Sequence, residues 1–236
     1  MNKLWKMLRK KDVGAIGIGA MIVFIAMVLV AGIAASVLIQ TSNTIQSQAM
    51  STGQATTREV SSGVAVFDIE GKINVTHAGT PNETKADMKY LAITVKARPG
   101  SDDIDLNNTY ILLSDGNKKA LLRYGYNQSG LFQDDADGNV FDILDDTQWN
   151  LSNRETFGIA VIQDYDNSIK QYTPVLNRGD KAILLVRCSP EENGTFNAEI
   201  PERTDVFGQV IPEVGSPGVI AFTTPMSYPD IIYDLQ

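Results

Sequence analysis

Cysteine and histidine are almost absent from this sequence, which contains Cys188 and His77 as its single examples. One cysteine allows no disulfide within the chain and no cysteine-based metal cluster. Because Cys188 follows the apolar stretch "AILLVR", we expect it to pack as a small buried hydrophobic residue. His77 stands in a polar, turn-like stretch, so the two residues make a poor catalytic pair.

Sequence motifs of catalysis are also missing. The chain has no glycine-rich phosphate loop, no histidine cluster and no nucleophile elbow. Adjacent carboxylates such as Asp145 and Asp146 are typical of solvated turns rather than of an acid/base pair. We therefore expect that the chain is not an enzyme.

Positive charge is scarce outside the N-terminus. The whole chain has a net charge of −8, but residues 1–14 contain five basic residues and one acidic residue, so the remainder carries −12. An acidic surface of this size argues against nucleic acid as a partner, because phosphates require a basic face.

Charge is absent altogether between Asp12 and Arg58, and residues 15–39 are an apolar run. As a helix, these 25 residues would extend about 37 Å, enough to cross a bilayer core of about 30 Å. Three interpretations compete: a cleaved secretory signal, a permanent membrane anchor, or a helix that leaves the membrane to pack against copies of itself. The run is too long for a simple signal, and the basic residues before it place the N-terminus in the cytoplasm.

Two features favour the packing helix. Small residues recur four apart, Ala31 with Ala35 and Gly32 with Ser36, and such pairs allow helix backbones to approach closely. The helix pattern then continues through the neutral stretch "QTSNTIQSQAMSTGQATT", which can be packed among other helices without burying an unpaired charge.

The stretch "VGAIGIGAMIVFIAMVLVAGIAASVLIQTSNTIQSQA" resembles the N-terminus of archaeal flagellins (archaellins). The resemblance implies that residues 1–14 are a leader removed by a prepilin-type peptidase between Gly14 and Ala15. It also implies that residues 15–62 form the helical core of a filament. The assembly-helix residues that match the motif include Gly17, Gly19, Phe24, Met27, Ala31 and Ala35.

Residues 63–236 change to short apolar or alternating runs separated by Gly, Pro, Asn and Asp. About eight strands with turn signals between them predict an antiparallel Ig-like β-sandwich, and hence an α+β chain. "GVAVFDIEGKINVT" is interpreted as strand, turn and strand. "LSDGNKKALL" predicts a hairpin, since Asp115, Gly116 and Asn117 favour turns with positive φ.

Six Asn-X-Ser/Thr sequons lie in this second part. They can be N-glycosylated only if the domain is outside the cytoplasm, as the charge asymmetry requires. Asn-rich turns in a Thr-rich protein would also generate such triplets by chance. The candidate N-glycosylation sites are Asn74, Asn82, Asn107, Asn127, Asn150 and Asn193.

The stretch "QDDADGNVFD" offers carboxylate oxygens of the kind that bind Ca²⁺ or Mg²⁺. It does not fit the helix–loop–helix calcium motif, because Gln133 occupies the first position and Leu144 the twelfth. An acidic solvated turn is the simpler interpretation, and a structural cation is the alternative. The candidate ligands are Asp134, Asp135 and Asp137.

Together these observations predict a structural subunit of the archaeal flagellum filament, located outside the cell and made from a membrane-inserted precursor. Its partners would be copies of itself, related archaellins and the prepilin-type peptidase. Two alternatives are an adhesive type IV-like pilus subunit and an uncleaved, membrane-anchored binding domain. The first would be expected to carry a Glu at the position of Gly19, and the second an aromatic or charged belt after residue 39.

Overall fold

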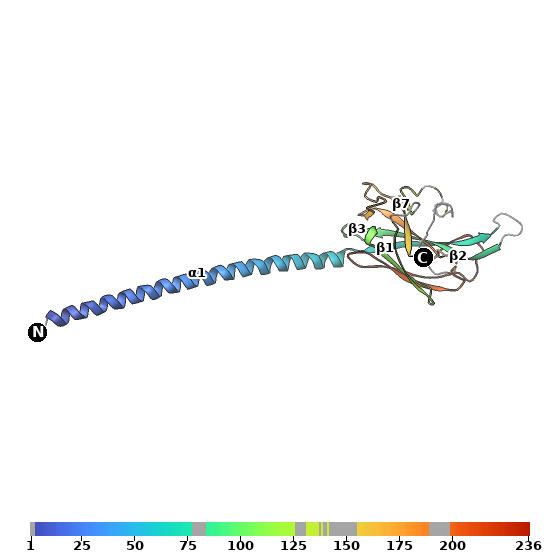
Figure 1. The fold of residues 1–236 in the computed structure, drawn as a ribbon. Coiled ribbons are helices and arrows are strands. Elements are labelled where there is room, and N and C mark those ends of the chain that lie inside the picture. Colours follow the sequence, from blue (N-terminus) through green and yellow to red (C-terminus); the bar gives the residue numbers. More distant parts are fainter. Residues whose placement is uncertain are drawn as a thin grey trace. The chain divides into compact units, whose positions relative to one another are not determined.

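The computed structural model describes residues 3–76, 84–125, 131–136, 138, 141, 155–188 and 199–236 (Figure 1). The chain divides into two compact units, Met1–Ala55 and Thr56–Gln236. The predicted division into residues 1–14, 15–62 and 63–236 follows processing and assembly rather than compactness, and it stays a prediction.

The first element is a single helix, α1 (Lys3–Ser61), of 59 residues. At 1.5 Å per residue it is about 88 Å long. Its large apolar side chains from Ile16 to Ile45 are all exposed by about half or more, because nothing in its own unit covers them. By length and composition, Ile16–Ser61 contains a segment able to cross a membrane. An isolated helix of this composition requires lipid or other helices around it.

In the described part of the second unit there are twelve strands and one 3₁₀ turn. The strands that form its main sheet are β1 (Val64–Thr76), β2 (Thr84–Ala97), β4 (Tyr110–Ser114), β5 (Lys119–Tyr124), β6 (Phe132–Gln133), β7 (Thr156–Gln163), β9 (Lys181–Arg187), β10 (Asp205–Ile211), β11 (Gly218–Thr223) and β12 (Ile232–Asp234). A small separate sheet pairs β3 (Ile104–Asp105) with β8 (Val175–Leu176), and η1 (Leu106–Asn108) is the 3₁₀ turn.

The main sheet has the strand order β11-β10-β4-β5-β7-β9-β2-β1-β12, with β6 beside β7. All its pairs are antiparallel except β5 with β7 and β6 with β7. One half of the sheet consists of β11, β10, β4 and β5, and the other half consists of β7, β9, β2, β1 and β12. The two halves enclose one apolar core, which contains Ile69 and Leu91 from the second half and Leu113 and Ile220 from the first. The predicted α+β class, a long apolar helix followed by an antiparallel β-sandwich, is confirmed.

One predicted turn is wrong. The stretch Val64–Thr76 forms the single strand β1, with no reversal at Gly71. Its pairing with β2 continues through Gly71, with register shifts between Val66 and Asp68 and between Lys72 and Val75. Gly71 is needed for a different reason: a Cβ atom there would collide with the sulfur and methyl group of Met88 on β2.

Two local predictions are confirmed. β4 and β5 form the expected hairpin, in which Gly116 has φ of +84° and the carboxylate of Asp115 accepts hydrogen bonds from the amides of Asn117 and Lys118. Of the three turn residues, only Gly116 takes a positive φ. Cys188 is fully buried in the main core, and burial raises the pKa of its thiol.

Candidate functional site

The predicted assembly residues all lie on α1. At 100° per residue, Gly17, Phe24, Met27, Ala31 and Ala35 share one face of the helix, whereas Gly19 lies on the opposite side. Phe24 and Met27 are 67% and 68% exposed. A face that mixes large apolar side chains with small ones can interlock with another helix at short range.

Further residues of α1 line a shallow apolar groove on the helix surface. They include Ala26, Val30 and Ala34, which follow one another at four-residue intervals. Apolar surface is therefore presented around much of the helix, as expected of an element that is surrounded by lipid or by several other helices. Gly14 is exposed, and the side chain of Ala15 is not described.

Just after α1, the chain is held by backbone hydrogen bonds on two sides. The carbonyl of Ser62 accepts from the amide of Ser216 at 2.9 Å, and the carbonyl of Gly63 accepts from the amide of Arg98 at 2.9 Å. The hydroxyl of Ser62 also accepts from the amide of Asp102 at 3.2 Å. Ser62 is only 3% exposed, so these bonds are shielded from water.

Glycine is required on both sides of this connection. A Cβ atom on Gly63 would collide with Ser216, and one on Gly215 would collide with the carbonyl of Ser62. Gly215 also has φ of +100°, a conformation that other residues rarely adopt. The sequence analysis missed this connection, although "EVGSPG" carried a turn signal.

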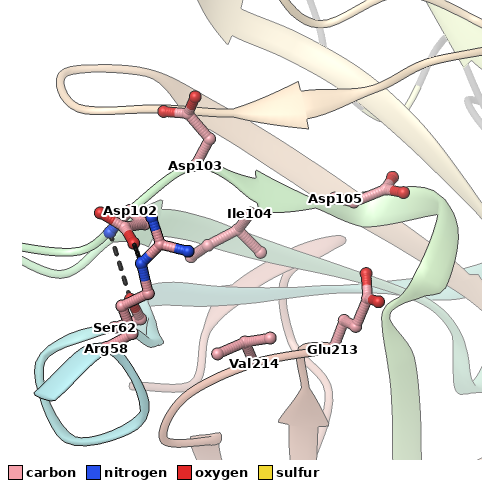
Figure 2. Close-up of a pocket in the computed structure, with 8 residues that line it drawn as sticks. All are labelled: Arg58, Ser62, Asp102, Asp103, Ile104, Asp105, Glu213 and Val214. Carbon is pink, nitrogen blue, oxygen red and sulfur yellow. Dashed lines mark hydrogen bonds and ion pairs between the residues drawn. The ribbon is translucent and has the colours of Figure 1, made fainter. Parts of the chain in front are cut away.

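Beside this connection is an acidic cavity of about 200 Å³ (Figure 2). Arg58 in the last turn of α1 points into it and pairs with Asp102, with 3.0 Å between Nε and Oδ2. The other charged residues that line the cavity are Asp103, Asp105 and Glu213. One guanidinium and four carboxylates therefore line the cavity, which keeps a net negative charge.

A second acidic group lies in the connection between β7 and β9. The carboxylates of Asp164, Asp166 and Asp180 each place an oxygen within 4.8 Å of the others. The carboxylate of Asp180 accepts hydrogen bonds from the hydroxyl of Ser168 and the amide of Asn177, at 3.2 and 3.0 Å, and burial raises its pKa. Oxygen ligands at this spacing have the chemistry that Ca²⁺ or Mg²⁺ requires.

The sequence analysis did not find this group, because its members are spread over a long, turn-rich connection and meet only when β8 folds back. The ligands that it predicted lie elsewhere. Asp134 and Asp135 are exposed beyond β6, and Asp137 lies outside the described residues. A cation at those three residues stays a prediction.

Of the six sequon asparagines, two lie within the described residues. Asn74 lies in β1, and its side chain is not described. Asn107 lies in η1, where Thr109 of the same triplet is fully buried and donates its hydroxyl to the carbonyl of Asp105. The asparagines that fall outside the described residues are Asn82, Asn127, Asn150 and Asn193.

Comparison with known proteins identifies the relatives of the chain. Residues 14–222 match the family model for archaeal-type flagellin. Flagellin B3 of Thermococcus kodakarensis is 39% identical, over 96% of this chain and 98% of its own. Flagellin B2 of Methanocaldococcus jannaschii is 44% identical, over 96% of this chain and 95% of its own.

Solved structures agree on the fold. The crystal structure of archaeal flagellin FlaB1 from Methanocaldococcus jannaschii covers 74% of this chain and 97% of its own, with 31% identity and a TM-score of 0.57. The archaeal flagellum of Methanospirillum hungatei strain JF1 covers 93% and 98%, with a TM-score of 0.58. At 13% identity, this second likeness concerns the fold alone. The chain belongs to the archaeal-type flagellin family and, as a flagellin, is a structural subunit of the archaeal flagellum filament.

Proposed function

We propose that the chain is made as a membrane-inserted precursor and becomes a filament subunit only when residues 1–14 are removed. In the precursor α1 spans the bilayer, and the β-strand unit is outside the cell. A prepilin-type peptidase cuts between Gly14 and Ala15, and the freed helices exchange lipid for one another.

The observation that carries this proposal is the exposed, uncharged surface of α1. From Ala15 to Thr57 the helix has no charged residue, and its large apolar side chains from Ile16 onward are exposed. The five basic residues and one acidic residue of the leader would bring charge into any bundle of such helices, and burying unpaired charge is costly. The family match supports the position of the cut, since it begins at Gly14.

Five of the proposed assembly residues, Gly17, Phe24, Met27, Ala31 and Ala35, share one face, which we assign to contacts between helices. Gly19 faces the other way and would meet a different neighbour in a bundle that surrounds each helix. Contacts of this kind between unlike faces do not close on themselves, so they generate a helical filament.

The β-strand unit then forms the outside of the filament, where its sequons are available for glycans. Asn107 is poorly suited to carry a glycan in the folded unit, because the hydroxyl of its triplet is buried and already bonded. Glycans would add polar surface outside the cell, where the acidic residues already favour solubility.

The test is N-terminal sequencing of protein sheared from the surface of cells that make it. We expect the sequence to begin at Ala15 and the material to consist of thin filaments. A Gly14→Val variant should keep Met1, stay in the membrane fraction and give no filaments. Gly53→Val, at an open position of the same helix, should be processed normally. Filaments with an intact leader would refute the proposal.

A further inference from the structure

The outer face of four neighbouring strands, β11, β10, β4 and β5, carries exposed apolar side chains among polar ones. Along each strand one set of residues is buried in the core, and the alternate set points outward. The outward set includes Tyr110, Leu112, Leu121, Phe207, Ile211 and Val219, which we call the outer apolar face.

Strand register places these residues side by side. Leu112 lies opposite Leu121, Tyr110 lies opposite Ile211, and Gln209 lies between Leu112 and Val219. Four strands at about 4.8 Å spacing make a surface roughly 14 Å across between the outer strands. Tyr110, Leu121, Phe207 and Val219 are between 45% and 59% exposed.

On the other half of the sheet, the outer face is covered by the chain itself. There, outward-facing residues of β2 and β9, such as Ala92 and Leu185, are buried under Leu131 and Phe141 in a second apolar cluster. The chain thus uses its own loop to cover one outer face. Within the described ranges, the face on β11, β10, β4 and β5 has no such cover.

Charge indicates which partner fits this face. Its β5 side carries two outward basic residues, Lys119 and Arg123, in a part of the chain that is otherwise strongly acidic. A neighbour therefore needs carboxylates beside apolar surface. Helix α1 has no carboxylate between Ala15 and Thr57, so the uncharged part of the helix of another copy does not supply them.

The acidic cavity supplies the carboxylates. Asp105 and Glu213 lie at its rim, and the amide of Asn108 holds both, at 3.1 and 3.3 Å from their oxygens. We propose that the outer apolar face binds the β-strand unit of a second copy of this chain, with Lys119 and Arg123 against the acidic rim of that copy. Because the two surfaces differ, the contact is head-to-tail and repeats along a filament.

The proposal rests on the assembly of flagellin subunits into filaments, but not on the processing of the leader. It is therefore tested on filaments whose presence has been confirmed beforehand. A cysteine is introduced at Val219, and the rate of maleimide labelling is compared between intact filaments and detergent-dissociated subunits.

We expect labelling at position 219 to be at least about tenfold slower in filaments. Equal labelling of position 219 in both forms would overturn the proposal.

A second measurement identifies the occupant. A carbodiimide joins a lysine amine to a carboxylate in direct contact, so treated filaments should yield covalent dimers linked through Lys119 to the segment 102–105 or to Glu213. Lys119→Arg keeps the charge but removes the amine, and it should abolish these dimers. Protection of position 219 without dimers through Lys119 would assign the face to another occupant and refute the proposed contact.

Discussion

The Nε atom of Arg58 lies 3.0 Å from Oδ2 of Asp102, which joins the last turn of α1 to the segment after β2. Arg58 is the first charged residue after Asp12, so charge returns to the chain where the β-strand unit begins. A cation in the last turn is also favoured by the partial negative charge at the helix C-terminus. The ion pair therefore marks the end of the uncharged segment, which we propose is surrounded by other helices in the filament.

We expect this ion pair to add little stability. Its side chains are 72% and 58% exposed, and exposed pairs contribute about 0–1 kcal/mol. Arg58→Ala should therefore change the free energy of unfolding by less than about 1 kcal/mol in urea titrations of the full chain in mild detergent. A larger loss would mean that the acidic cavity depends on Arg58 for its fold.

The connection formed by Gly63 and Gly215, beside this ion pair, should contribute more to the free energy of unfolding. Gly215→Ala would strain a backbone with φ of +100° and push a methyl group into the carbonyl of Ser62. We expect a loss of roughly 1–3 kcal/mol or more in the same titration, with the larger values reflecting the collision. Gly100→Ala is the control, because Gly100 has φ of +86° but open space around it. Equal losses for the two variants would show that only the backbone strain counts.

Features that are specified by a short stretch of sequence could be predicted. The helix was predictable because 25 consecutive apolar residues and a neutral extension have few other interpretations. The β4–β5 hairpin was predictable because Asp115 and Gly116 specify their turn locally.

Features decided by pairing between distant segments were not predictable. The continuity of β1 through Gly71 depends on β2, and the meeting of Asp164 with Asp180 depends on the fold of the long connection between β7 and β9. The parallel pairing of β5 with β7 likewise leaves no periodic signal in either strand.

Stability should depend on pH through Glu70. Burial, and then the nearby charges of Asp68 and Asp234, raise the pKa of this carboxyl above its ordinary value of 4.5. Between the unfolded and folded pKa values the folded state binds more protons, so stability falls as the pH rises through that window. Asp234 lies directly opposite Glu70 on the edge strand β12, where like charges repel.

Glu70→Gln should remove this dependence. We expect the variant to match the wild type near pH 4 and to be more stable by a few tenths of a kcal/mol at pH 7, about the size of a cross-strand charge pair. Urea titrations at several pH values provide the measurement. Glu155→Gln, at an exposed residue, serves as the control. If Glu70→Gln leaves the pH slope unchanged, Glu70 is not the responsible group.

Cys188 should be unreactive in the folded chain. It is fully buried, and burial raises the pKa of its thiol, so both access and thiolate are lacking. We expect no measurable reaction with maleimide at pH 8 over an hour in native filaments, and complete reaction in 8 M urea. Reaction in the native state would show that the core between the two halves of the sheet opens, and single-cysteine labelling would then need a Cys188→Ala background.

Close packing of α1 should depend on its small residues. Ala31 and Ala35 lie on the face that also carries Phe24 and Met27, and a larger side chain there would hold a neighbouring helix away. Ala31→Leu keeps the helix apolar and able to span a membrane, so synthesis and processing of the precursor should be unchanged. Filament yield should fall by at least about tenfold, as measured by electron microscopy and by the amount of protein sheared from cells.

Val28→Leu adds a similar group at a position that is already large and should assemble normally. Normal filaments from Ala31→Leu would show that this face of the helix does not make the close contact.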